Sequence, residues 1–385
     1  MKTLLIYLAL FLTMTGSTVD TFDGKIKSFN KEWINEVKVI SLNNSDQLKT
    51  LNKSYVELSN ELLSETIIDR CAAIEKKLDI ERQFYIYNAS VESQFSALRY
   101  RKGIELIKMI YEKILGLDHH FTSLKTYQNI TELTNPAAYS EFSKAKDLIK
   151  ERLDKKNDIA LPNLLNSNPY VSVTMSLIGS FFGKGDKQER ESDLENISCI
   201  IDFTLRMNAD LNIIYYESEF LKESNNTLRE ECHKLFKEYT KVVGYFTPLL
   251  ECRQADDWET LNDKVTETMT MIESSQMGED LLKKNKAIRK MNDLEFSIDR
   301  LLQFLDKYAD FVADGELYYG KFKTILNNYG NEKQCTSQLP HQFATLKDDV
   351  EISVKKFNQA YAISELQGSK LRDLLYGVPT DNTGM

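Results

Sequence analysis

The chain has 385 residues, of which 42% are hydrophobic and 28% charged, with only 15 glycines and 6 prolines. This composition excludes collagen-like and low-complexity chains, and its apolar content excludes a disordered one. The formal net charge is −9 and the lysines and arginines are interspersed with acids, which excludes nucleic acid as the expected partner. The scarcity of glycine and proline favours helices.

The first 17 residues predict a secretory signal peptide. Lys2 gives a positive start, residues 4–12 form an apolar run, and Thr15 and Ser17 place small residues at positions −3 and −1 of a cleavage site. The run is shorter than the about 20 residues that a membrane-spanning helix needs. We therefore expect a secreted or periplasmic protein, cleaved after Ser17. Because the removed segment carries Lys2 and no acid, the formal charge goes from −9 to −10.

Residues 18–158 are expected to form an N-terminal helical region. Its apolar residues recur at intervals of three and four, the pattern of a helix that packs on another helix. The first stripe comprises Leu48, Leu51, Tyr55, Leu58 and Leu62. The second, in a shifted register, comprises Ile67, Cys71, Ile74 and Leu78. The shift predicts a break near residues 64–66, or a helix that turns its face to a second partner. A further stretch runs from Phe84 to Gly116, and Asn135-Pro136 suits the start of a helix over 137–156.

Residues 187–376 are expected to form a C-terminal helical region, followed by a flexible tail over 377–385. The spacing predicts helices over 187–223, 226–245, 258–276, 279–329 and 341–375, with a turn at Ser224-Asn225-Asn226. Only residues 171–175 alternate as a short strand would. The fold class is therefore all-α, with long, roughly antiparallel helices in an elongated bundle or a coiled-coil-like rod. A spectrin-like array would show the same spacing.

The connector over residues 159–186 is unlike the rest of the chain, because residues 159–183 carry no charged side chain. Burial between helices is the interpretation that we favour. An exposed surface for a protein partner, or a tongue that dips into a membrane, would also explain the gap. The candidate contact residues are the larger side chains of its second half: Tyr170, Val171, Val173, Met175, Leu177, Ile178, Phe181 and Phe182.

An apolar segment between long helices resembles the plan of α-helical pore-forming toxins of the cytolysin A kind. The resemblance covers the plan and transfers no residues. It implies that membrane activity through residues 170–183 is the alternative function.

The sequence predicts no catalytic residue, cofactor site or metal site. Cys232 and His233 are adjacent in a helical pattern, where neighbours diverge by about 100°, so they do not indicate a catalytic pair. His119-His120 is a polar stretch at a helix end. Residues 179–185 have neither the spacing nor the Ser or Thr of a phosphate loop. Paired tyrosines such as Tyr215-Tyr216 are expected in the core or in helix seams.

The five cysteines are Cys71, Cys199, Cys232, Cys252 and Cys335, and the sequence leaves their pairing open. An odd count leaves at least one thiol free or bonded to another chain.

We expect a non-enzymatic protein whose work is protein–protein interaction or scaffolding, through its helix faces or through the uncharged segment. The partner protein is not identified by the sequence, and self-association through helix faces is compatible with it. An enzyme whose site is assembled from scattered residues is the weakest of the hypotheses.

Overall fold

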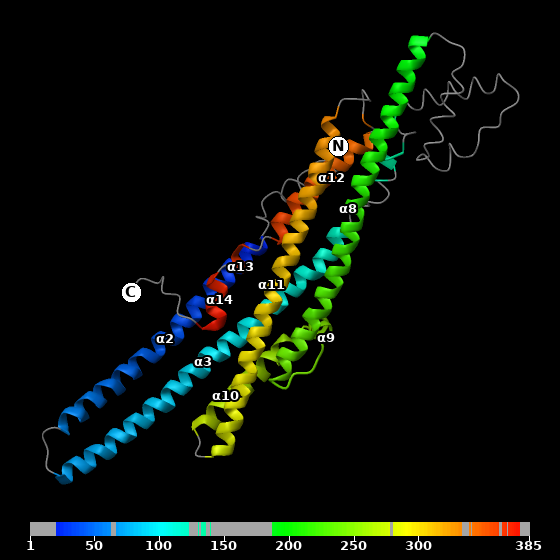
Figure 1. The fold of residues 1–385 in the computed structure, drawn as a ribbon. Coiled ribbons are helices and arrows are strands. Elements are labelled where there is room, and N and C mark those ends of the chain that lie inside the picture. The colour runs from blue at the N-terminus through cyan, green and yellow to red at the C-terminus, as the bar shows by residue number, and fades with distance from the viewer. Residues whose placement is uncertain are drawn as a thin grey trace, which may run out of the picture. The chain divides into compact units, whose positions relative to one another are not determined.

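The computed structural model of the chain describes residues 21–62, 67–122, 130, 132–135, 139, 187–277, 280–332, 339, 341–361, 364–367 and 369–377. Every regular element in this part of the chain is an α-helix (Figure 1). The predicted all-α class is therefore confirmed.

The first two helices are α2 (Phe22–Glu61) and α3 (Ile67–Thr122). Helix α2 begins behind Thr21, whose hydroxyl accepts a hydrogen bond of 3.1 Å from the backbone N–H of Gly24 and so satisfies a donor that the helix leaves unpaired. The predicted break in this region is confirmed, because two helices flank residues 63–66.

The middle of the chain forms α8 (Lys187–Lys241), α9 (Leu249–Ala255), α10 (Trp258–Met277) and α11 (Leu281–Asn331). The predicted turn at residues 224–226 is wrong, since α8 continues through it. Asn225 is only 1% exposed there, and Leu221 and Leu228 on the same helix are buried too. Burial of this continuous face outweighs the turn preference of the Ser-Asn-Asn sequence.

The last part of the chain forms α12 (His341–Tyr361), α13 (Ser364–Gln367) and α14 (Ser369–Tyr376), so the prediction of one helix over 341–375 is wrong. Helix α13 is tied to the start of α2 by a hydrogen bond of 2.8 Å from the backbone N–H of Glu365 to the carboxylate of Asp23. Helix α14 buries Leu371, Leu374 and Leu375. The apolar spacing alone is compatible with one continuous helix. The separate contacts of α13 and α14 instead hold two short helices in place.

The chain divides into two compact units that are interleaved along the sequence. Unit 1 comprises residues 1–115, 226–312 and 359–385, and unit 2 comprises residues 116–225 and 313–358. Helices α8 and α11 each contribute residues to both units.

The core of unit 1 is built on the apolar faces of α2 and α3. Helix α2 buries Phe22, Ile26, Phe29 and Trp33, which recur at helical spacing. On α3, Tyr100 stacks on Tyr239 of α8 with ring centroids 4.4 Å apart.

The far part of α2 packs against the start of α3 through the first of the two predicted stripes. Tyr55 contacts Phe84 edge-on at 6.3 Å, and the hydroxyl of Tyr87 donates a 2.9 Å hydrogen bond to the backbone carbonyl of Asn44. The second predicted stripe does not face α2, because Cys71, Ile74 and Leu78 are all exposed. The first stripe lies on α2 and faces α3, whereas the second lies on a face of α3 that α2 does not cover.

Unit 2 pairs the first part of α8 with the last part of α11, and α12 packs on α11. Phe203 of α8 lies edge-on to Tyr329 of α11 at 5.4 Å, and Tyr319 of α11 contacts Phe357 of α12 at 5.3 Å. The ring of Phe357 lies directly over Gly315, where a side chain would collide with it.

Candidate functional site

The eight residues predicted as contact candidates, Tyr170, Val171, Val173, Met175, Leu177, Ile178, Phe181 and Phe182, lie outside the described residues. In the part of the chain that the structure describes, no helix is both long and apolar enough to cross a membrane. The candidate site described below was not predicted, and it lies on unit 2.

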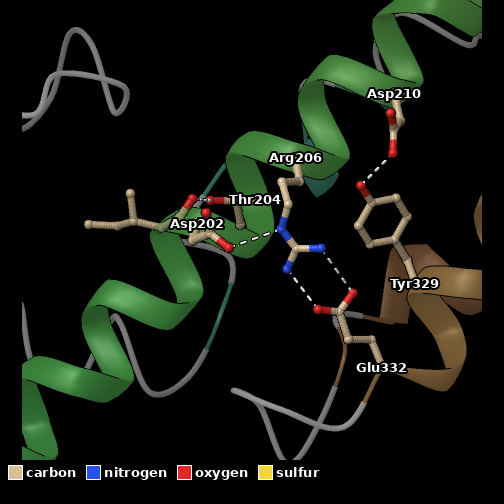
Figure 2. A network of polar contacts seen from close by, with 7 residues as sticks. Asp202, Thr204, Arg206, Asp210, Tyr329 and Glu332 are labelled. Atoms are coloured by element: carbon tan, nitrogen blue, oxygen red, sulfur yellow. Dashed lines mark hydrogen bonds and ion pairs between the residues drawn. The ribbon is translucent and has the colours of Figure 1, made fainter.

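A polar network joins α8 to the end of α11 (Figure 2). The guanidinium of Arg206 bonds the carboxylate of Asp202 at 2.9 Å and reaches both oxygens of Glu332, at 2.7 and 3.4 Å. One turn further along α8, Asp210 accepts a 2.6 Å hydrogen bond from the hydroxyl of Tyr329. The contacts Arg206–Glu332 and Tyr329–Asp210 join α8 to the end of α11, and together they hold the helices in one register.

Two groups of this network, Arg206 and Tyr329, keep their protons near neutral pH. The hydrogen bonds to Glu332 and then to Asp202 raise the pKa of Arg206, which keeps it charged. Burial and the bond to Asp210 raise the pKa of Tyr329, so its hydroxyl stays protonated. Neither group can exchange a proton near neutral pH, and general acid–base chemistry needs a group whose pKa lies close to the working pH.

An apolar groove with a volume of about 690 Å³ opens on the same pair of helices. Its residues are Ile213 and Ile214 of α8 and Ala313, Glu316, Leu317, Gly320, Lys321, Thr324 and Ile325 of α11. Apart from its two chain neighbours and the backbone of its own helix, no atom lies within 4 Å of the place where a side chain of Gly320 would begin. The absence of a side chain at residue 320 therefore helps to open the groove.

Exposed apolar side chains continue the groove along α8. Ile213, Tyr216 and Phe220 follow one another at intervals of three and four and so share a face of the helix, and Leu317 lies opposite on α11. All four are between 55% and 69% exposed. Single exposed apolar residues are ordinary on protein surfaces, but a contiguous group beside a groove is typical of an interaction site.

A salt bridge of 2.8 Å between Glu217 of α8 and Lys321 of α11 lies at the edge of this groove. Together the groove residues, Tyr216, Phe220 and this ion pair form what we call the α8–α11 groove. It has an apolar centre and a charged edge, the arrangement found in surfaces that bind another protein.

The prediction that Tyr215-Tyr216 lies in the core or a seam is wrong for Tyr216, which is exposed. The spacing of Ile213, Tyr216 and Phe220 was the available signal. It shows that the three share a face, but the same spacing occurs on buried faces, as Tyr319, Phe322 and Leu326 of α11 show.

The cysteine and histidine that are adjacent in sequence lie in unit 1 and do not form a nucleophilic pair. Burial raises the pKa of Cys232 to about 12, which keeps it a thiol. Burial and then the charge of Arg229 lower the pKa of His233, whose Nε2 lies 3.0 Å from the hydroxyl of Tyr111. Among the described residues there is also no group of three side chains that could hold a metal ion.

Comparisons with protein-family models, with curated proteins and with solved structures return no match for this chain.

Proposed function

We propose that this chain is a secreted or periplasmic, non-enzymatic protein that binds a partner protein through the α8–α11 groove. The observation that carries the proposal is the groove itself, with four large apolar side chains exposed along two neighbouring helices. Exposing such a surface is costly in water, and covering it in a complex recovers about 25 cal/mol per Å² of apolar area.

The shape of the groove favours an amphipathic helix as the bound element. Two antiparallel helices leave a furrow between them, and a third helix fits into it with apolar side chains at intervals of three and four. Tyr216 and Phe220 are side chains of the kind that dominate binding energies when a partner buries them.

The state of the cysteines supports the proposed compartment. Cys199 is disulfide-bonded, and disulfides persist mainly in secreted and periplasmic proteins. This agrees with the expectation of a signal peptide over residues 1–17.

The test is photocrosslinking from inside the groove in the native host. A benzoylphenylalanine at residue 317 should form an adduct with one defined protein, because Leu317 lies in the groove. The same probe at residue 282 is the matched control, since Leu282 is 81% exposed on the same helix but lies in unit 1. With the probe kept at residue 317, Ile213→Asp and Gly320→Leu should each lower the yield of that adduct at least tenfold without lowering the melting temperature, and Leu282→Asp should not.

Equal adducts at residues 317 and 282, or a complex that survives both groove variants, would contradict the proposal. Dye leakage from phosphatidylcholine–phosphatidylglycerol vesicles, abolished by Val173→Asp or Leu177→Asp, would replace it with the membrane-active alternative.

A further inference from the structure

A second apolar stripe lies exposed on α3, in unit 1, and it does not belong to the groove. Cys71, Ile74, Leu78 and Tyr85 are separated by three, four and seven residues, so they share one face of the helix. Ile74, Leu78 and Tyr85 are between 48% and 68% exposed, and Cys71 carries an exposed free thiol. On another face of the same stretch, Phe84 and Tyr87 already contact α2.

The spacing of the stripe is that of a coiled-coil seam. Residues 71, 78 and 85 occupy one heptad position and residue 74 occupies the second apolar position of the repeat. A helix with this repeat packs best against another helix of the same kind. The remaining seam position is Glu81, which accepts a 3.3 Å hydrogen bond from Tyr55 of α2.

The charges beside the stripe point to a second copy of the same chain as the occupant. Glu75 and Arg82 occupy the same flanking position of successive heptads and have opposite charges. In an antiparallel pair of identical helices, the same flank of each helix faces the other copy. A two-fold axis near Leu78 therefore places Glu75 of each copy beside Arg82 of the other. A parallel pair would instead stack Glu81 on Glu81 in the seam.

We propose that the protein forms an antiparallel homodimer through residues 71–85 of α3. The contact covers the apolar stripe and adds two symmetric Glu75–Arg82 ion pairs. It uses residues of unit 1 alone, and the proposal is independent of the proposed binding function.

The arrangement makes a separate prediction for Cys71. Residue 71 lies about 7 residues from the two-fold axis, which at 1.5 Å per residue puts the two Cys71 thiols about 22 Å apart along the seam. They cannot form a disulfide with each other in an antiparallel dimer, whereas a parallel dimer would bring them together.

The test is sedimentation equilibrium of the mature protein between about 1 and 200 μM. We expect a reversible monomer–dimer equilibrium, and Leu78→Glu should raise its dissociation constant at least tenfold. Leu282→Glu is the matched control, because Leu282 is also exposed and lies away from the stripe, and it should leave the dissociation constant unchanged.

Charge reversal tests the orientation. Glu75→Arg alone and Arg82→Glu alone should each raise the dissociation constant several-fold, because each creates two like-charge contacts. The double variant should restore it to within about threefold of the original.

A monomer throughout the concentration range, a dimer unaffected by Leu78→Glu, or single reversals that the double variant does not rescue would overturn the proposal. So would a covalent dimer linked through Cys71 on a non-reducing gel. Groove photocrosslinking that is unchanged by Leu78→Glu would show that the two surfaces act separately.

Discussion

Two glycines in the middle of helices show how the same residue has opposite roles in this protein. Gly103 of α3 lies against the ring of Tyr239, and an added Cβ would be 2.9 Å from Cζ of Tyr239 and 3.2 Å from Cδ2 of Leu301. Tyr239 is buried and stacked on Tyr100, so its ring has no room to move away. A Cβ added at Gly320 of α11 would meet no atom within 4 Å beyond its two chain neighbours and the backbone of its own helix.

Alanine at these two positions should change stability in opposite directions. Gly103→Ala is expected to lower the free energy of unfolding by about 1–3 kcal/mol, because the new methyl group overpacks a rigid aromatic pair. Gly320→Ala is expected to raise it by about 0.5–1 kcal/mol, since alanine has the better helix propensity and meets no obstacle. Urea denaturation followed by circular dichroism measures both. A stabilising Gly103→Ala would show that the Tyr100–Tyr239 stack is not close-packed.

Lys102 shows that a charged residue can belong to the core of unit 1. Its side chain is almost fully buried, and its ammonium group lies 2.9 Å from Glu36 of α2 and 3.1 Å from Glu105 of its own helix. Burial acts to lower the pKa of Lys102, but the bonds to Glu36 and Glu105 together outweigh it and leave the pKa raised. The residue therefore stays charged and ties α3 to α2.

At the scale of elements, ion pairs fix the register of α8 against α11. In unit 1, Glu231 bonds Lys307 at 2.8 Å and Glu238 bonds Arg300. In unit 2, Glu217 bonds Lys321 at 2.8 Å. The acids on α8 are separated by multiples of seven residues, so they lie along one line of the helix, and each meets a base of the antiparallel partner.

A charge-reversal series on the two unit 1 pairs tests this role. Glu231→Lys together with Glu238→Lys should lower the free energy of unfolding by about 1–2 kcal/mol, because exposed pairs contribute little each and two repulsions replace them. Adding Lys307→Glu and Arg300→Glu should recover most of the loss, and 1 M salt should shrink both effects. The measurement is the urea midpoint of the three proteins. No recovery in the quadruple variant would mean that apolar packing alone sets the register.

At the scale of the whole molecule, each unit is assembled from segments that are distant in the sequence. Unit 2 takes part of α8 and part of α11, and Cys199 in that part of α8 is disulfide-bonded. Cys71, Cys232 and Cys252 carry free thiols, so Cys335 is the one remaining cysteine in the chain.

A non-reducing peptide map of the protein purified from its native host should link the peptide that contains Cys199 to the peptide that contains Cys335. Cys199→Ser should then lower the free energy of unfolding by about 2–4 kcal/mol, because the cross-link restricts the unfolded chain. Cys71→Ser is the matched control and should have no such effect. A free Cys199 thiol in that protein would contradict the prediction and weaken the proposal of an oxidising compartment.

Much of the helical structure could be predicted because its signals are local. The expected helix over 258–276 agrees with α10, and the expected helix over 279–329 agrees with α11 to within two residues at each end. The errors occur where tertiary packing overrides a local preference. The turn at residues 224–226 is absent because Asn225 is buried, and the expected last helix is three elements because α13 and α14 make their own contacts.

The sequence by itself determined that the chain is all-α and which faces of its helices are apolar, because helical periodicity depends only on the order of residues. Only the tertiary structure decided which of those faces are covered. The stripe at Leu48, Leu51 and Tyr55 packs on α3, whereas the stripe at Ile74 and Leu78 remains exposed. The two have the same spacing, and they differ because covering a face requires a neighbouring helix, which no local pattern specifies.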